Sequence, residues 1–366
     1  MKSARFRVVV VVVAILSAVV RTDASNHAVK GVRFERAAFN PSAGERVRIQ
    51  YELASAATIT IKVYDPDGGL VAVPADRVAQ EPGNREVTWD GRDIDGVVVP
   101  DEAYHATIET SSGFTYDPAG SGGEIGDITT AEFDAEAGTV VYRLPKPARV
   151  LIRCGVRNGP MLKTLVDWKP RVAGSITEYW DGRDEDKLVS ARSLKDFRAL
   201  ITYVTLADAT VIAFGNSGES YRDAKLGRWK DRPKKVVPET SATPSGAPIA
   251  ATLVPPAWSR TPRVRVSMGE TDSGGVVPDL REEATVRVDV DPMDRADLLR
   301  DQFEVIFFVD NVFFSEAERG YLPLTWHWEL QQLPPGEHVL TVNISSVRGQ
   351  VGVGSRRVRI LEKANP

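Results

Sequence analysis

Carboxylates gather in two equivalent short segments of the sequence, and at this density they could bind calcium. The first segment holds Asp90, Asp93 and Asp95, and the second holds Asp181, Asp184 and Asp186. Calcium takes six to eight oxygen ligands, so three carboxylates within six residues could supply part of a site. The alternative is turn chemistry, because an Asp-Gly pair supports a tight turn and its carboxylate accepts backbone N–H groups without a metal. The spacing matches no known calcium loop and favours the turn.

A second acidic stretch lies between two expected strands near residue 290. It contains Asp289, Asp291, Asp294, Asp297 and Asp301. A solvated loop and a calcium site at a loop or between domains both fit this composition. The sequence favours the solvated loop, and Asp289, Asp291 and Asp294 remain the candidate ligands.

Other groups that could carry chemistry are scattered. The four histidines are His27, His105, His327 and His338, and none has metal-ligand spacing with another histidine or with the single cysteine. The sequence has no nucleophile-elbow motif and no phosphate-binding glycine loop. Trp326, His327 and Trp328 could form an aromatic platform for a sugar, but alternation with polar residues favours a core position for both indoles. We therefore expect no enzyme.

A longer repeat surrounds the first pair of acidic segments. Residues 89–93 read Trp-Asp-Gly-Arg-Asp and recur at residues 180–184, 91 positions later, which is close to the length of one small β-sandwich. Each tryptophan can fill a sandwich core, and Gly91 and Gly182 can take the left-handed backbone that a tight turn needs. The repeated positions are Trp89, Asp90, Gly91, Asp93, Gly96 and Tyr104 in the first copy, and Trp180, Asp181, Gly182, Asp184 and Phe197 in the second. Lys187 replaces the second glycine, which predicts a longer or less regular hairpin.

This motif resembles the Ig-like domain of the flagellar hook-capping protein family (FlgD). That domain has a Trp-Asp-Gly-x-Asp turn, then Gly and Pro, then Gly-x-Tyr; here Pro100 and Tyr104 match, and Glu102 stands where the family has its last glycine. The resemblance covers the two copies and does not make the chain a hook cap. Residues 307–310, 324–326 and 333–342 resemble another bacterial Ig-like type. The resemblance implies non-catalytic binding modules.

The rest of the pattern is all-β, and it predicts three tandem Ig-like or fibronectin-III-like β-sandwiches. Short alternating strands separated by Gly, Pro and Asp turns are typical of such sandwiches. We expect the modules at residues 31–118, 127–216 and 259–362, with a charged and then proline-rich linker at residues 217–258.

The first 24 residues resemble a secretory signal peptide. Lys2, Arg5 and Arg7 precede an apolar run over residues 8–20, and small residues follow before Ser25. An uncleaved anchor is the alternative, and no later segment is apolar enough to span a membrane. The leader carries four basic residues against Asp23, so its removal would change the formal net charge from −4 to −7. An acidic chain is a poor nucleic-acid binder.

These observations favour an exported bacterial protein, either secreted, periplasmic or on the cell surface. Its expected role is structural or adhesive, or one of assembly, with a protein or cell-surface partner bound by pairing at a sheet edge. The alternative is a glycan-binding accessory protein of a surface hydrolase system. Cys154, the single cysteine, alternates with apolar residues and is expected to be buried.

Overall fold

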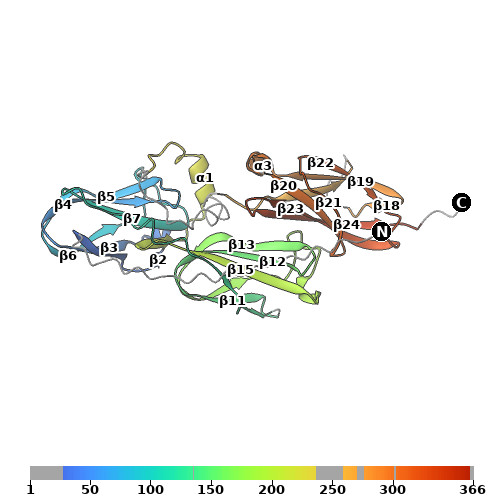
Figure 1. Ribbon diagram of the computed structural model, residues 1–366, viewed down its shortest axis with the longest axis horizontal. Coiled ribbons are helices and arrows are strands. Elements are labelled where there is room, and N and C mark those ends of the chain that lie inside the picture. Colours follow the sequence, from blue (N-terminus) through green and yellow to red (C-terminus); the bar gives the residue numbers. More distant parts are fainter. Residues whose placement is uncertain (1–27, 135, 236–258, 270–275, 301, 363–366) are drawn as a thin grey trace, which may run out of the picture.

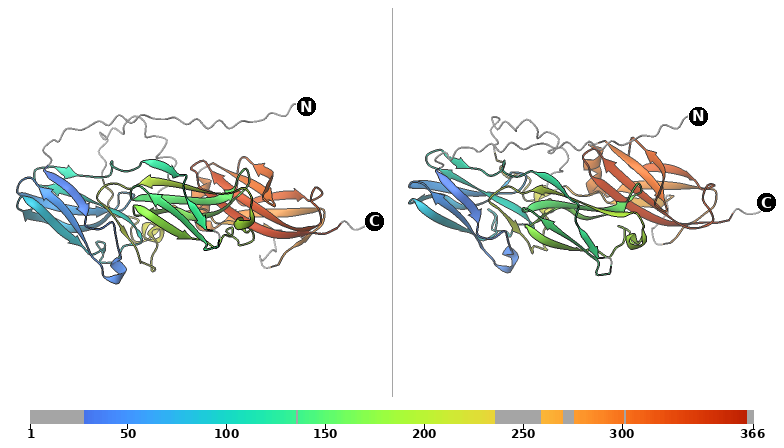
Figure 2. Two further views of the ribbon diagram at one scale, coloured as in Figure 1. Left: turned by 90° about the horizontal axis from the view of Figure 1, so that it is seen from below. Right: turned by 60° about the horizontal axis from the view of Figure 1, so that its bottom comes forward.

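The computed structural model describes residues 28–134, 136–235, 259–269, 276–300 and 302–362. Within them the chain forms three β-sandwich modules placed along an elongated molecule, with the first and third modules at opposite ends (Figures 1 and 2). The all-β class is therefore confirmed. The predicted leader and residues 236–258 of the predicted linker lie outside the described residues. Among the described residues, no helix has the length and apolar character that crossing a membrane requires.

The first module packs a three-stranded sheet, in the order β1-β3-β6, on a larger sheet in the order β2-β16-β7-β4-β5, with β8 beside β7. Alternation explains its core, because every second residue of β3 is buried between the sheets. Its elements are β1 (Val29–Phe34), β2 (Ala38–Phe39), the 3-10 turn η1 (Pro41–Ala43), β3 (Val47–Leu53), β4 (Ala57–Tyr64), β5 (Leu70–Gln80), β6 (Gly83–Trp89), β7 (Glu102–Thr110) and β8 (Thr115–Tyr116).

The second module repeats this plan with sheets in the orders β10-β11-β14 and β13-β12-β15-β9. Its central strand β12 is buried over the residues from Ala148 to Ile152, as expected for a strand with neighbours on both sides and a sheet packed against it. Its elements are β9 (Ile125–Ile128), β10 (Glu132–Asp134), β11 (Thr139–Leu144), β12 (Ala148–Val156), β13 (Met161–Arg171), β14 (Gly174–Tyr179), η2 (Ala191–Ser193) and β15 (Phe197–Thr205).

The third module has sheets in the orders β17-β19-β22 and β18-β24-β23-β20-β21. Its core contains aromatic and β-branched side chains from both sheets, including Phe307, Trp328 and Val342. Its elements are β17 (Val264–Met268), β18 (Asp279–Leu280), β19 (Glu283–Val290), the helix α3 (Pro292–Leu299), β20 (Phe303–Val309), β21 (Val312–Ala317), β22 (Leu324–Glu329), β23 (Gly336–Ser346) and β24 (Val351–Ile360).

The path of the chain differs from the simple tandem order at one point. Strand β16 (Thr210–Ala213), which the sequence analysis placed in the second module, pairs antiparallel with β7 and parallel with β2 of the first module. Residues 214–235, mostly assigned to the linker, follow as a segment that contains the helix α1 (Tyr221–Leu226) and packs on the first module. The second module is thus inserted into the first. Strand β16 covers an edge of β7 that would otherwise have no partner.

Candidate functional site

The first Trp-Asp-Gly-Arg-Asp turn closes on itself through local hydrogen bonds. The indole of Trp89 is 2% exposed and donates from Nε1 to the carbonyl oxygen of Arg92 at 2.9 Å. Asp90 accepts the backbone N–H of Arg92 at 3.0 Å, and Gly91 has the left-handed φ of +73°. A side chain at Gly91 would also meet Pro41 and Phe39, so this position needs glycine both for its backbone and for its close packing.

The second turn has the same local structure. Trp180 is 4% exposed and donates to the carbonyl oxygen of Arg183 at 2.8 Å, and Asp181 accepts the N–H of Arg183 at 3.0 Å. Lys187 takes the left-handed conformation that Gly96 has in the first copy, with φ values of +61° and +75°. The hairpin that begins at Asp184 is one residue longer, since its N–H reaches Val189, whereas that of Asp93 reaches Val97.

Both indoles lie among equivalent aromatic rings. Trp89 lies between Phe39 and Tyr104 at centroid distances of 5.5 and 5.6 Å, and Trp180 lies 5.5 Å from both Phe133 and Phe197. The hydroxyl of Tyr104 donates to the carbonyl oxygen of Pro100 at 2.8 Å. Burial raises the pKa of Tyr104 well above its usual value, so the hydroxyl stays neutral and can make this bond.

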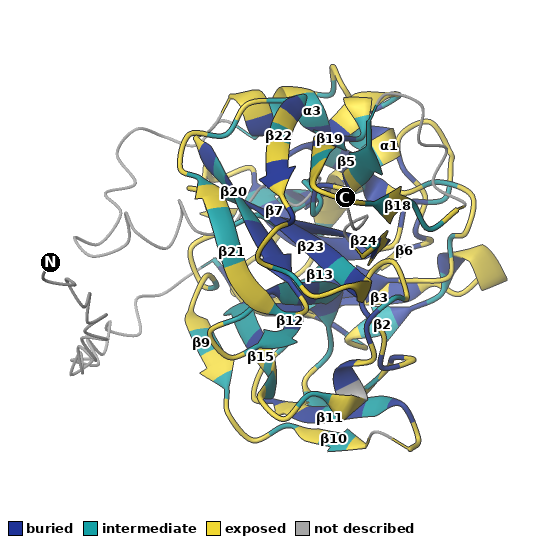
Figure 3. Ribbon diagram, turned by 90° about the vertical axis from the view of Figure 1, so that its right-hand side faces the viewer, coloured by how far each residue is buried: buried dark blue, intermediate teal, exposed yellow. Residues whose placement is uncertain are grey.

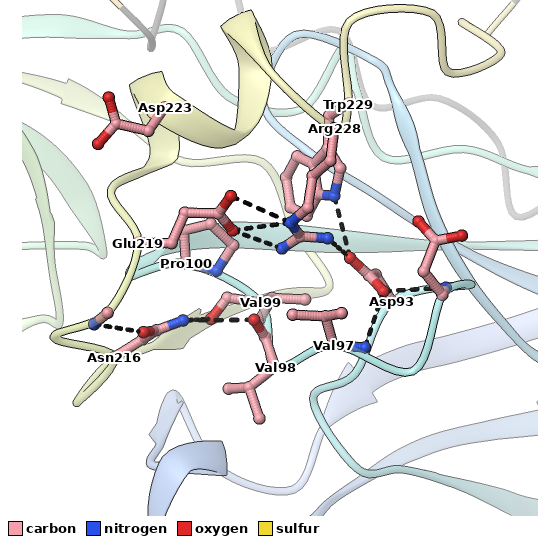
Figure 4. Close-up of polar contacts among 12 residues, drawn as sticks. Asp93, Val97, Val98, Val99, Pro100, Asn216, Glu219, Asp223, Arg228 and Trp229 are labelled. Atoms are coloured by element: carbon pink, nitrogen blue, oxygen red, sulfur yellow. Dashed lines mark hydrogen bonds and ion pairs between the residues drawn. The ribbon is translucent and has the colours of Figure 1, made fainter.

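The docking segment, residues 214–235, binds Oδ2 of Asp93, the carboxylate oxygen that makes no hydrogen bond within the first turn (Figure 4). Oδ1 of Asp93 accepts backbone N–H groups within the turn, while Oδ2 receives Arg228, the indole N–H of Trp229 at 3.0 Å, and Arg232 at 3.0 Å. Arg232 also reaches Asp95 at 2.6 Å. The two guanidinium carbons lie 4.9 and 4.8 Å from the ring centre of Trp229, which adds cation–π attraction.

Further contacts hold the docking segment at both ends. The side-chain amide of Asn216 donates to the carbonyl oxygen of Val99 at 3.1 Å (Figure 4), and the ammonium of Lys225 contacts Asp65 at 2.8 Å. At the far end, the N–H of Leu70, the first residue of β5, donates to the carbonyl oxygen of Pro233 at 2.9 Å. The segment therefore spans from the acidic turn to the start of β5.

The second copy presents the equivalent positions to the third module instead. Met161, 91 residues after Leu70, exchanges two hydrogen bonds with the side-chain amide of Asn343, at 2.8 and 2.9 Å. Asp167 accepts the N–H of Thr261, and Asp186 accepts the N–H of Ser355. An asparagine amide has one donor and one acceptor side by side, so Asn343 pairs with the backbone as a neighbouring strand would.

In the second copy, no described residue contacts Oδ2 of Asp184 as Arg228 and Arg232 contact Oδ2 of Asp93. Its Oδ1 accepts the N–H of Val189 at 2.8 Å, whereas Oδ2 is buried without a hydrogen-bond partner among the described residues. The same carboxylate is thus used on one side only in the second copy.

A buried ion pair joins the first and second modules. Glu102 at the start of β7 contacts Arg149 of β12 at 2.5 Å, and their side chains are 3% and 9% exposed. Arg149 also donates to the carbonyl oxygen of Trp168 at 2.9 Å. Glu102 stands where the resembling family has glycine, and its carboxylate provides a contact that glycine could not make.

Most of the candidate calcium ligands contact arginine side chains in the structure. Asp90 caps its own turn, and Asp93 and Asp95 contact the docking segment. In the third module, the three candidates contact arginine guanidinium groups: Asp289 with Arg295, Asp291 with Arg265 and Asp294 with Arg260. Across the described ranges, no three His, Cys, Asp or Glu side chains are placed to hold a metal ion. The calcium hypothesis therefore has no support from this geometry.

The hypothesis that Trp326, His327 and Trp328 form an aromatic platform for a sugar is wrong. Trp328 is fully buried, and Trp326 is packed against the core, stacked on Phe307 at 4.1 Å and on Trp328 at 5.6 Å. Phe313 is half exposed on the edge strand β21. Cys154 lies in the second core, and burial raises the pKa of its thiol to about 12.

Several residues that join the modules were not found from the sequence. Arg228, Trp229 and Arg232 lie in a charged stretch that reads as a linker, and an isolated tryptophan between two arginines was their only signal. For Glu102 the signal was its departure from the family's glycine. Asn343 had no such signal, because an asparagine in an alternating strand fits any partly exposed position.

The two packed sheets of each module and the repeated Trp-Asp-Gly-Arg-Asp turn define a protein of tandem Ig-like sandwiches. Residues 37–113 match the family model of the FlgD Ig-like domain, which confirms the resemblance for the first module. A search of curated protein sequences finds no match.

Solved structures give further similarities. The fibronectin(III)-like modules of CbhA from Clostridium thermocellum share 11% identity over 92% of this chain and 99% of that chain, with a TM-score of 0.20. A structure concerning host cell surface retention of a 1.5-MDa bacterial ice-binding adhesin shares 11% over 92% and 98%, with a TM-score of 0.18. A superoxide reductase (neelaredoxin) from Ignicoccus hospitalis shares 15% over 27% and 82%, with a TM-score of 0.17. These TM-scores support no argument about function.

Proposed function

We propose that this chain is an exported, non-catalytic structural or adhesive protein whose Ig-like modules bind a protein or cell-surface partner. The polar contacts between its modules are the observation that supports this proposal. Buried charged and amide groups, which in an enzyme would converge on a substrate cleft, here fix one module against the next. The chain would thereby act as a stiff spacer that presents strand edges at defined positions.

Three junctions contribute to this stiffness. Glu102 with Arg149 joins the first two modules, and Asn343 with Met161 joins the last two. Arg222 of the docking segment donates to the carbonyl oxygen of Met293 in α3 at 3.0 Å, which connects the first module to the third. Because these contacts are directional and those of Glu102 and Asn343 are largely buried, they favour one relative placement of the modules over a flexible string.

The edges that would meet the partner are the terminal strands of the sheets. In the strand orders, β6, β14 and β21 each have a neighbour on one side. Such strands offer unpaired backbone N–H and C=O groups that an extended segment of another protein can pair with. This mode of binding needs no catalytic group and suits the mild negative charge of the chain, which disfavours nucleic acid.

An envelope fraction offers the direct test. The full-length protein is immobilised, and bound components are compared between the wild type and three single lysine variants at exposed edge positions: Thr88→Lys in β6, Tyr179→Lys in β14 and Val312→Lys in β21. We expect one defined component to be lost with one of the variants and retained with the other two, since lysine on an edge blocks strand addition. Equal capture by all four proteins would contradict binding at these edges.

A further inference from the structure

The hairpin loop between β12 and β13 carries an asparagine followed by a glycine, at the junction of the second and third modules. We propose that Asn158 is a site of spontaneous deamidation, in which the chain itself supplies the nucleophile and water is the only co-reactant. The inference goes beyond the proposed function and does not depend on it, because the reaction needs no partner. It places a covalent change at the contact between two modules.

Asn158 has the sequence context that this reaction needs. It is the only asparagine in the sequence that precedes a glycine. Deamidation begins when the backbone nitrogen of the next residue attacks Cγ of the asparagine side chain. A glycine leaves that nitrogen accessible, because it has no side chain beside it. Both reacting atoms belong to neighbouring residues and close a five-membered ring, so the attack has the advantage of an intramolecular reaction.

The loop presents these residues to solvent. Arg157 and Asn158 are exposed, and Asn158 has the left-handed φ of +59° that asparagine adopts more readily than most residues. Its side-chain amide makes no hydrogen bond to any residue that the structure describes. Two backbone bonds close the loop, from the N–H of Val156 to Pro160 at 2.9 Å and from the N–H of Gly159 to Val156 at 3.0 Å. The attacking nitrogen is thus held by one hydrogen bond, at a hairpin tip, where local opening costs least.

The reaction balances with water alone. The nitrogen of Gly159 forms a bond to Cγ of Asn158, the bond from Cγ to the side-chain nitrogen breaks, and ammonia leaves with the proton of the Gly159 N–H. Water then opens the succinimide at either of its carbonyl carbons, which yields aspartate or isoaspartate. Both products carry a carboxylate in place of a neutral amide, and isoaspartate also adds one carbon atom to the main chain.

A second asparagine with the same backbone conformation lies at this junction and supplies a comparison. Asn311, in the turn between β20 and β21, has a φ of +68°, and its carbonyl oxygen would lie 2.9 Å from a side-chain carbon placed on Gly159. The two turns therefore lie against each other. Asn311 precedes Val312, whose branched side chain crowds the nitrogen that would have to attack. The modification should thus occur on the second-module side of the contact and not on the third-module side.

The change bears on how the second and third modules are held together. Met161, two residues after Gly159, exchanges two hydrogen bonds with the side-chain amide of Asn343. A lengthened main chain at residue 158 would displace Gly159 against Asn311 and disturb the start of β13. The backbone of both turns should therefore open more often in the modified protein, and the junction should loosen as the protein ages.

Mass spectrometry of the full-length protein, kept in a mildly alkaline buffer and sampled over weeks, tests the inference. We expect the peptide that contains Asn158 to gain about one dalton, as aspartate and isoaspartate, because an amide becomes a carboxyl group. The peptide that contains Asn311 should keep its mass. Amide hydrogen exchange over residues 156–161 and 309–313 should be faster in the aged protein than in the fresh one.

Two variants are the matched controls, and circular dichroism verifies that each is folded. Asn158→Gln keeps an amide in the loop but would have to close a larger ring, so the aged variant should show neither the mass gain nor the faster exchange. Val312→Gly changes an exposed position at the start of the edge strand β21 (Figure 3) and gives Asn311 the same context, so Asn311 should then gain the same mass.

No mass gain at Asn158, or an equal gain at Asn311 in the wild type, overturns the inference. A gain at Asn158 without faster exchange overturns the effect on the junction. None of these results bears on whether an edge strand captures an envelope component, so the proposed function stands or falls separately.

Discussion

The two Trp-Asp-Gly-Arg-Asp turns have the same local structure and different neighbours. In each turn the tryptophan indole is buried and donates to a carbonyl oxygen three residues on, and one carboxylate oxygen of the last aspartate accepts N–H groups of the hairpin. The second carboxylate oxygen is where they differ. That of Asp93 holds two arginines and a tryptophan, whereas that of Asp184 has no partner among the described residues.

This difference separates the part of the motif that makes the fold from the part that makes tertiary contacts. The turn itself needs only one oxygen of each aspartate, together with glycine and tryptophan. The other oxygen and the start of the neighbouring strand form a docking position, occupied by residues 214–235 in the first module. In the second module, the third module contacts the nearby Asp186 and Met161 instead. A duplicated module can therefore keep its fold while it exchanges what is bound beside the turn.

The largest expected effect comes from removing the indole that anchors the docking segment. Trp229→Ala should lower the free energy of unfolding of the first module by about 3–5 kcal/mol, because it leaves a cavity in a packed core. Trp229 is 2% exposed, belongs to the first core, and donates to Asp93. Denaturant unfolding, followed by tryptophan fluorescence and circular dichroism, measures the change.

Lys230→Ala is the matched control for this substitution. Lys230 is exposed and adjoins Trp229 in the same segment, so its change should stay within about 0.5 kcal/mol of the wild type. If Trp229→Ala were equally mild, the docking segment would not be part of the core of the first module.

The contact between the first two modules should respond almost as strongly. Glu102→Gln leaves the guanidinium of Arg149 buried without its charge partner, which should cost about 3 kcal/mol. The double variant Glu102→Leu with Arg149→Met removes both charges and should recover most of that loss, since apolar residues of similar size often replace a buried pair without penalty. Denaturant unfolding of the single and double variants measures both changes in the free energy of unfolding. A double variant less stable than the single one would contradict this account of the pair.

A parallel substitution in the two turns tests their difference directly. Asp93→Asn leaves Arg228 and Arg232 facing a neutral amide and should cost about 2 kcal/mol. Asp184→Asn keeps an acceptor for Val189 and removes a charge that has no cation among its described contacts, so we expect a loss of less than about 1 kcal/mol. The two variants are compared by denaturant unfolding under identical conditions. Equal losses would show that the contacts of Oδ2 of Asp93 contribute little to stability.

The features that depend on neighbouring residues in the chain could be predicted from the sequence. The contacts between segments that are distant in the chain could not. The 91-residue repeat placed Trp89 and Trp180 in equivalent cores because a tryptophan before an Asp-Gly turn has little choice of position. It did not place β16, since a strand of four residues, three of them apolar, can complete any free edge of suitable length. Trp229 was also missed, because its environment is formed by a turn more than 130 residues earlier. The aspartates of both acidic regions were recognised as candidate ligands, but charge spacing alone does not tell an arginine from a metal ion.

The smallest expected effect concerns the junction of the second and third modules and depends on pH. His338 faces two acceptors, Asp310 at 2.6 Å and the carbonyl oxygen of Pro334 at 2.9 Å, so only the doubly protonated imidazolium can donate to both. Burial lowers the pKa of His338, but the hydrogen bonds to Asp310 and Pro334 outweigh it, and the net shift is upward.

A raised histidine pKa contributes stability below the unfolded value of about 6.5, and this contribution is lost as the pH rises through the folded value. The pair adjoins the turn whose Asn311 backbone lies against Gly159 of the second module, so the effect should appear at this junction.

Buried His105, whose pKa burial lowers to about 4, gives the opposite slope below about pH 6.5, so the effect of His338 is read as a difference between proteins. In thermal unfolding between about pH 5 and 8, the midpoint of the wild type should fall with rising pH relative to that of His338→Gln, and Asp310→Asn should reduce this relative fall. A Trp229→Ala background should leave that relative fall unchanged, because Trp229 lies in the core of the first module and His338 and Asp310 lie in the third. A midpoint difference between the wild type and His338→Gln that does not change with pH would contradict this account of the pair.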